Sequence, residues 1–181
     1  SSLMFDGSDL PLAENIAATR AIAALAHAAG LSCEGAIGFV GYAAGTASVG
    51  TDPQEAARFA RETGIDAIAV SVGNVHLQRR TGGQLDEERI AAIATLTRVP
   101  LVIHGGSGVP LEQRRHLAAQ SSVCKFNIGT ELRQAFGAAL RATLAADPEA
   151  FDRLAILKAT EAPLTEATRA VLRSVRSEGR A

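Results

Sequence analysis

The alternation of apolar runs and helix-like stretches constrains the fold of this 181-residue chain more than any other feature. Apolar runs begin near residues 2, 31, 67, 100 and 123, and each is followed by a stretch of helical length. One such stretch, residues 53–63, opens with Asp52-Pro53, an N-cap followed by proline at the first helical position. This alternation predicts repeated βαβ units and a parallel sheet. The runs are almost wholly apolar, as in strands buried on both faces.

Five βα units fit two architectures. One is a small open sheet, and the other is a (β/α)₈ barrel, which needs eight units and typically about 250 residues. The chain opens directly on a strand, so in the second case it supplies the last five units and the first three strands precede Ser1. We treat residues 1–181 as a single domain, in which residues 147–181 form helical patches broken by Pro148 and Pro163.

The composition argues against several functional classes. A formal net charge of -1 is unlike that of a dedicated nucleic-acid binder or a binder of acidic membranes. The two cysteines, Cys33 and Cys124, are too few for a disulfide scaffold and fit a reducing compartment, so we expect a cytoplasmic protein. We expect no membrane span and no signal peptide, because no apolar run approaches the roughly 20 residues of a span.

Polar residues stand where predicted strands end, namely Asp6, Glu34, His76, His104 and Asn127. In a barrel, this rim holds the active site. His76 and His104 end consecutive strands, and neighbouring parallel strands lie about 4.8 Å apart, so the two imidazoles can reach one metal ion. The alternative is that each ring caps a loop through hydrogen bonds. Two ligands are too few for a stable site, so a third must come from elsewhere. His27 and His116 fall on outer helix faces and are interpreted as surface or packing residues.

Glycine-rich turns follow the last two predicted strands, at Gly105-Gly106-Ser107-Gly108 and Asn127-Ile128-Gly129-Thr130. Glycine lets the backbone approach a ligand closely, and the N–H groups of a helix N-terminus bind anions. The last two loops of a barrel are its common phosphate site. We therefore predict that a phosphorylated ligand binds Gly105, Gly106, Ser107, Asn127, Gly129 and Thr130. The alternative is a pair of tight βα turns that simply need small residues.

Lys125 precedes Asn127 by two residues, so both side chains should face the same side of the strand. A lysine there could form a Schiff base with a carbonyl substrate, which would make a metal-free enzyme. The reading we favour is an interior charge paired with a carboxylate.

Several segments, taken in order, resemble a known family. They are Met4-Phe5-Asp6-Gly7-Ser8, Thr51-Asp52-Pro53, Gly73-Asn74-Val75-His76, residues 100–110 (PLVIHGGSGVP) and residues 125–133 (KFNIGTELR). The chain is similar in these segments to the class II, metal-dependent ketose-bisphosphate aldolases of the fructose- or tagatose-bisphosphate type. The likeness is clear from residue 1 to about residue 145 and looser beyond.

The resemblance implies roles for particular residues. His76 and His104 match two of the family's three zinc-binding histidines. Phosphate contacts match Gly105, Ser107 and Thr130, and a contact to the dihydroxyacetone-phosphate portion matches Asn127. The family's remaining metal histidine and its catalytic aspartate lie on an earlier strand, which would precede Ser1.

The chain departs from the family pattern at several places. Ala36 stands where the family has a further metal-site Glu, and Leu77 stands where it has Gly. The family's mobile loop carries a Glu that moves a proton, but here Ala43 and Ala44 occupy that stretch. Tyr42 is then the candidate catalytic residue of the loop over residues 39–50, which we expect to be a mobile lid. The alternative is that Tyr42 only packs the lid shut.

Motifs and resemblance together predict a metal-dependent aldolase with the fold of a (β/α)₈ TIM barrel, of which the chain supplies five βα units and C-terminal helices. The expected reaction cleaves a phosphorylated ketose to dihydroxyacetone phosphate and an aldehyde, as in glycolysis and related carbohydrate metabolism. We expect Zn²⁺ or another divalent metal, with a monovalent cation as a further candidate. We also expect a homo-oligomer, either a dimer or a tetramer. Two rivals stay open, a non-catalytic phosphosugar-binding relative and the metal-free Schiff-base aldolase.

Overall fold

Five parallel strands form one sheet in the computed structural model, which describes residues 1–42, 45, 47–77 and 82–179. The strands lie in sequence order, and each neighbouring pair is parallel. Their bounds are β1 (Ser2–Phe5), β2 (Ser32–Ile37), β3 (Ala67–Val70), β4 (Leu101–Ile103) and β5 (Val123–Phe126). This order and direction confirm the repeated βα units expected from the apolar runs.

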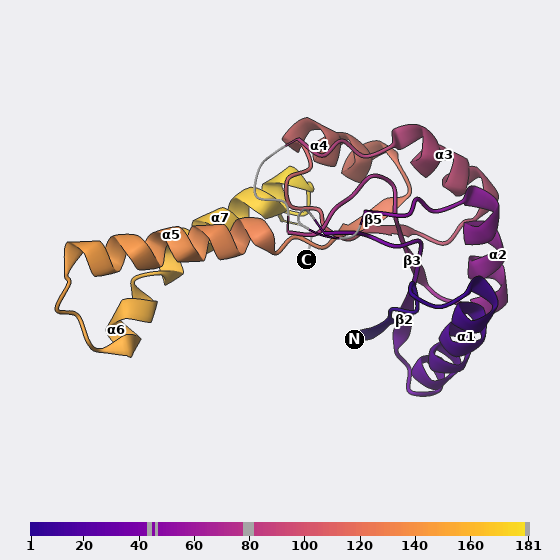
Figure 1. Cartoon of the computed structure of the whole chain (residues 1–181), viewed down its shortest axis with the longest axis horizontal. Helices are drawn as coiled ribbons and strands as arrows, with labels where there is room; N and C mark the ends of the chain where they lie inside the picture. Colours follow the sequence, from indigo (N-terminus) through magenta and orange to yellow (C-terminus); the bar gives the residue numbers. More distant parts are fainter. Residues whose placement is uncertain (43–44, 46, 78–81, 180–181) are drawn as a thin grey trace.

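Four helices link the strands and cover one face of the sheet. Figure 1 shows them as an arc around the outside of the sheet, and they are α1 (Leu12–Ala28), α2 (Pro53–Thr63), α3 (Glu87–Leu96) and α4 (Leu111–Gln120). Three more helices follow β5 and form an arm that projects from the sheet, namely α5 (Thr130–Ala146), α6 (Arg153–Lys158) and α7 (Glu161–Ser174). Within the described ranges, no helix combines the length and apolar character that crossing a membrane requires.

Local sequence signals set the bounds of α2. The Asp52 carboxylate accepts hydrogen bonds from the backbone N–H groups of Gln54 and Glu55, at 2.9 and 3.0 Å. Pro53 takes the first helical position, where its missing N–H costs no intrahelical bond. Gly64 ends the helix in the left-handed conformation, with φ of 70°. These are the signals from which the sequence predicts a helix over residues 53–63.

The two faces of the sheet carry different side chains. Toward the helices, Ile68 and Ile103 are fully buried and join a large apolar core that includes Phe59 of α2. Burying each such side chain contributes about 1.5–3 kcal/mol to folding. Among the described residues, the buried apolar cluster on the opposite, inner face is small and consists of Ala36, Ala69 and Val102. Small side chains leave room there for the polar residues of the site.

Two expectations from the sequence are wrong in detail. Glu34 is the third residue of the six-residue strand β2, paired in register with Met4 and Ala67, and does not end the strand. Because side chains alternate along a strand, Glu34 points to the same inner face as Ala36, two residues farther on. Pro163 does not break a helix but lies in the first turn of α7. Proline is tolerated there because the first four N–H groups of a helix have no intrahelical partner.

Candidate functional site

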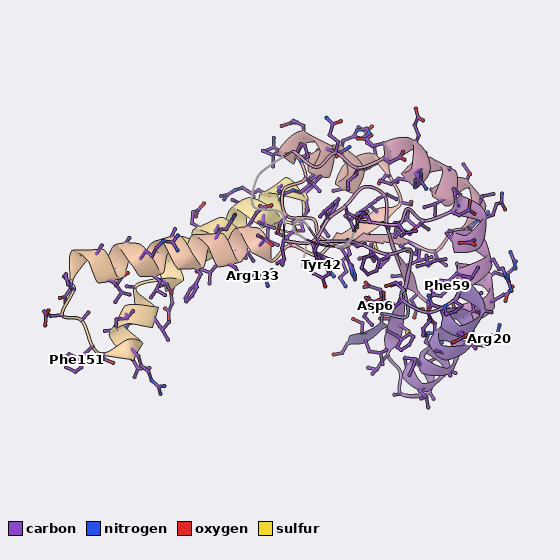
Figure 2. The ribbon with its side chains drawn as sticks, in the orientation of Figure 1. Asp6, Arg20, Tyr42, Phe59, Arg133 and Phe151 are labelled. Carbon is purple, nitrogen blue, oxygen red and sulfur yellow. The ribbon has the colours of Figure 1, made fainter. Side chains whose placement is uncertain are left out.

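The predicted site residues gather around one cavity of about 600 Å³ at the C-terminal ends of the strands. All of them line it except His104 and Gly106. His104 lines an adjoining cavity of about 110 Å³, which it shares with His76 and Tyr42. In Figure 2, Tyr42 lies near the centre of the molecule and Arg133 at the base of the helical arm. The remaining lining of the large cavity comes from Leu77, Phe126, Ile128 and Arg133.

The structure brings the two imidazoles together. The ring centroids of His76 and His104 are 6.3 Å apart, with an interplanar angle of 53°. The backbone N–H of His76 donates to the Gly41 carbonyl at 2.8 Å, which anchors its loop. Burial lowers the pKa of His76 below its usual value, the nearby His104 acts in the same direction, and Asp6 opposes both. The neutral imidazole, which is the form that ligates metals, is thereby favoured.

Glu34 holds His104 from the inner face of the sheet. Its Oε1 accepts from His104 Nε2 at 2.8 Å, and its Oε2 accepts from Lys125 Nζ at 2.6 Å. Burial alone would raise the pKa of Glu34, but these two hydrogen bonds outweigh it and hold that pKa below its ordinary value. In a His104 ring that carries one proton, this hydrogen bond places the proton on Nε2 and leaves the lone pair of Nδ1 for a metal.

Lys125 therefore forms an ion pair with a carboxylate. A salt bridge uses the charged ammonium, whereas a Schiff base needs the free amine. The 2.6 Å contact with Glu34 favours the paired interior charge over the Schiff-base reading.

The site supplies part of what a metal needs. His76 and His104 offer two nitrogen ligands at a small polar cavity, and a carboxylate orients one ring, as is usual for metal-binding histidines. Among the described residues, no three side chains of His, Cys, Asp or Glu are grouped to hold a metal. Ala36 lines the small cavity at the place where the family resemblance expects a carboxylate. The residues present thus fit a metal as two of its ligands.

We call residues 105–108 and 127–131 the glycine cradle. Ser107 Oγ accepts from the backbone N–H groups of Thr130 and Glu131, at 3.0 and 3.3 Å. The N–H of Gly106 donates to the Asn127 carbonyl at 3.0 Å, so Gly106 joins the two turns and does not line the large cavity. A hydroxyl that accepts still has one proton to donate, so Ser107 can also donate to an anion. The cradle ends at the N-terminus of α5, whose dipole favours negative charge.

Gly105 connects the cradle to the loop that carries His76. Its φ is +63°, and a Cβ built on it would stand 2.5 Å from the Val75 carbonyl oxygen and 3.2 Å from His76 N. Both observations require glycine. The cradle backbone therefore rests directly on the segment that carries His76.

Sequence reasoning did not select Arg133, which lines the large cavity. Its Nη2 donates to Thr130 Oγ1 at 3.4 Å, which puts a guanidinium beside the cradle. The sequence signal for Arg133 was its distance of three residues from Thr130, because residues three apart lie on one face of a helix.

Leu77 also lines the cavity, with φ of +59°. A residue with a side chain pays about 1 kcal/mol for this left-handed conformation, whereas glycine, the residue of the family pattern at this position, does not.

Tyr42 lines both cavities, and its side chain is largely exposed. Its ring centroid is 5.2 Å from that of His76, at an interplanar angle of 37°. Phe39 and Val49 exchange backbone hydrogen bonds of 3.1 and 2.8 Å, which closes the base of the loop. Ala43 and Ala44 lie outside the described residues, and the mobile lid stays a prediction.

Comparison with known proteins places these features in a family. The chain matches the class-II fructose-bisphosphate aldolase family over residues 1–180. A 6-phospho-5-dehydro-2-deoxy-D-gluconate aldolase from Shouchella clausii (strain KSM-K16) is 40% identical over 169 residues, covering 87% of this chain and 55% of that protein. The chain thus spans about half the length of this curated relative.

Solved structures share the fold. The YdjI aldolase from Escherichia coli K12 superposes with a TM-score of 0.83 at 29% identity, covering 99% of this chain and 62% of that one. Fructose-bisphosphate aldolase from Campylobacter jejuni gives a TM-score of 0.79 at 22% identity, over 98% and 61% of the two chains, and shows the fold alone. The five βα units are those of an aldolase TIM barrel, as expected from the sequence. The chain belongs to the class-II fructose-bisphosphate aldolase family.

Proposed function

We propose that the protein is a metal-dependent aldolase, which cleaves a phosphorylated ketose by a retro-aldol reaction to dihydroxyacetone phosphate and an aldehyde. The observation that carries the proposal is that His76 and the glycine cradle open on one cavity of about 600 Å³. Such a cavity can hold the phosphate at one end and present the ketone to His76 at the other, next to the adjoining cavity that His76 shares with His104. Fixed positioning of this kind is a major part of catalysis.

His76 and His104 are the proposed metal ligands. Zn²⁺ or another divalent ion bound there supplies a Lewis acid that polarises the ketone oxygen. Glu34 holds the His104 ring through Nε2, which leaves Nδ1 as the proposed ligand atom, and Lys125 holds Glu34 in place. A monovalent cation is kept as a further candidate.

The cradle is the proposed phosphate site. Ser107 and Thr130 supply hydroxyls, and Arg133 adds a cation beside Thr130. Gly105, Gly106 and Gly129 let the backbone approach the anion closely, and the N-terminus of α5 favours its charge. Asn127 lines the same cavity and is placed to hold the rest of the three-carbon ketone half.

The name of the Shouchella clausii relative suggests one candidate substrate, 6-phospho-5-dehydro-2-deoxy-D-gluconate. Cleavage of that compound breaks the bond between its third and fourth carbons. The hydroxyl on the third carbon loses its proton and becomes an aldehyde, and the fourth carbon gains a proton. The products are dihydroxyacetone phosphate and 3-oxopropanoate.

The test of the function is release of dihydroxyacetone phosphate from phosphorylated ketoses, followed by a coupled dehydrogenase. We expect the double variant Ser107→Ala, Thr130→Val to raise KM about tenfold, because two hydroxyl donors to the phosphate are lost. Thr143→Val, farther along α5, is the matched control and should leave KM unchanged. An unchanged KM in the double variant would reject the cradle as the phosphate site.

The second candidate function is a non-catalytic phosphosugar-binding relative. The presence of Ala36 in the small cavity favours it, because a carboxylate expected at the metal is missing. If this second function is the right one, the protein binds the phosphorylated ketose but releases no dihydroxyacetone phosphate in the same assay.

Tyr42 is the proposed candidate for proton transfer in the loop, with ring packing as its alternative. Because the ring packs on His76, we expect turnover of Tyr42→Phe to stay within about twofold of wild type, and that of Tyr42→Ala to fall further. A loss of about 10²-fold or more in Tyr42→Phe would instead assign proton transfer to the hydroxyl, as it matches the usual worth of a general acid–base.

We further propose that the enzyme acts in carbohydrate metabolism, glycolysis included, in the reducing environment of the cytoplasm. The free thiols Cys33 and Cys124 support that compartment. We propose a homo-oligomer, dimer or tetramer, which the exposed Phe151 and Leu154 of the arm support. The proposed small-molecule partner is a phosphorylated sugar.

A further inference from the structure

Arg114 joins three elements through a buried guanidinium. It lies on α4, and its side chain is 8% exposed. Nε donates to the Val109 carbonyl at 3.0 Å, and Nη1 donates to Ser174 Oγ of α7 at 3.4 Å. Nη1 and Nη2 each donate to one carboxylate oxygen of Glu131, and the Nη1 contact measures 3.2 Å. A two-pronged contact of this kind fixes orientation as well as charge.

Glu131 is the acidic member of the glycine cradle. It follows Thr130 in the first turn of α5, and its backbone N–H donates to Ser107 Oγ at 3.3 Å. Its Oε1 also accepts from the backbone N–H of Gly108 at 3.1 Å. The carboxylate therefore clamps both turns of the cradle. Arg114 and Glu131 also line a separate cavity of about 350 Å³ beside α7.

A carboxylate in this place creates a difficulty for a phosphate site. It is attracted to the same positive helix end as the phosphate, and two anions near one helix end repel each other. Water reaches the Glu131 side chain, which is 32% exposed, and screens part of this repulsion, but the part of the carboxylate turned toward the buried Arg114 is screened less. A cation bonded to both carboxylate oxygens removes most of the net charge and preserves the clamp on Gly108.

We propose that the Arg114–Glu131 ion pair is a positioning pair for the phosphate. Glu131 holds the two turns of the cradle together, and Arg114 cancels its charge so that the cradle accepts a phosphate dianion. The pair acts through the cradle and does not touch the substrate. This inference rests on the proposed phosphate role of the cradle.

The charge argument gives opposite signs for the two partners. The measurement is the dissociation constant of inorganic phosphate, obtained by calorimetry on the folded protein at low ionic strength. Arg114→Met should weaken binding by at least about fivefold, because an unpaired carboxylate remains at the cradle. Glu131→Gln should tighten binding by about twofold or more, because glutamine still accepts from Gly108 and the guanidinium is then uncompensated.

Further variants separate charge from packing. The double variant Arg114→Met, Glu131→Gln should bind phosphate within about threefold of wild type, since neither charge remains. Arg115→Met removes the neighbouring arginine of the exposed Arg115–Glu112 pair on the same helix and should have no effect. If Arg114→Met does not fold, Arg114→Lys keeps the charge without the two-pronged contact and should weaken binding less than fivefold.

Two results would overturn the inference in distinguishable ways. If Arg114→Met and Glu131→Gln weaken phosphate binding alike, the pair is only a structural brace, although the cradle still binds phosphate. If Ser107→Ala leaves phosphate binding unchanged, the cradle is not the phosphate site, and the role of the pair is lost with it.

Discussion

Replacing His104 with alanine should lower kcat/KM for the phosphorylated ketose by about 10³-fold or more. His104 supplies one of the two imidazoles at the small cavity, and its ring is held by Glu34 through a 2.8 Å hydrogen bond. Without this nitrogen only His76 remains of the pair, and one ligand does not retain a divalent ion. Loss of a group that stabilises developing charge costs about 10²–10³ in turnover, and loss of the metal itself costs more.

The measurement pairs kinetics with metal analysis. After equilibration with Zn²⁺ and removal of the free ion, we expect His104→Ala to hold a small fraction of the metal that the wild-type protein holds. His116→Ala is the matched control, because His116 is a half-exposed histidine 3.4 Å from Glu87 on the outside of the molecule. If His104→Ala keeps both metal and turnover, the paired imidazoles are not the metal site.

The second large effect is expected from Glu34→Ala, which should weaken metal affinity by 10- to 100-fold, the usual consequence of losing the carboxylate behind a metal-binding histidine. The variant should also lose about 2 kcal/mol in the free energy of unfolding. Breaking a buried ion pair costs about 3–5 kcal/mol. The expected loss lies below that range because Glu34 is 7% exposed but Lys125 is 49% exposed, so water can solvate the ammonium that is left.

Two controls separate the effects on metal binding and on stability. Glu112→Ala removes a carboxylate that is 83% exposed and should change neither quantity. Adding Lys125→Met to Glu34→Ala should recover part of the lost stability but none of the lost metal affinity. Unchanged metal affinity in Glu34→Ala would show that the Glu34–His104 contact does not prepare the ring for a metal.

Much of the fold was readable because its signals are local. Asp52 and Pro53 start a helix through contacts within three residues. The apolar run over residues 101–103 predicts a strand buried on both faces, and it forms β4. Pro163 shows the limit of this reasoning. A proline predicts a helix break unless the helix begins just before it, and the start of α7 carries no side-chain cap that the sequence could reveal.

The site was predictable where strand order determines distance. His104 directly follows β4, as expected, but His76 lies in the loop six residues beyond Val70, where β3 ends. Strand order therefore predicted the edge of the sheet at which the two rings meet, and the 6.3 Å approach depends also on the loop that carries His76. The partners of Glu34 were not predictable, because they lie 70 and 91 residues away along the chain and meet it only across the inner face. Arg114 gave no signal at all, since a buried arginine on α4 looks in sequence like any other charge on a helix.

The close approach at Gly105 constrains how this architecture can diverge. Because a Cβ there would stand 2.5 Å from the Val75 carbonyl oxygen, the loop that carries His76 and the glycine cradle can shift only together. A single substitution rarely shifts two backbone segments together, so the contact between Gly105 and Val75 resists gradual change. New specificities then arise most readily at positions outside this contact. With the proposed aldolase reaction, proteins that share this arrangement would keep the phosphorylated half of the substrate and vary the half that leaves as the aldehyde.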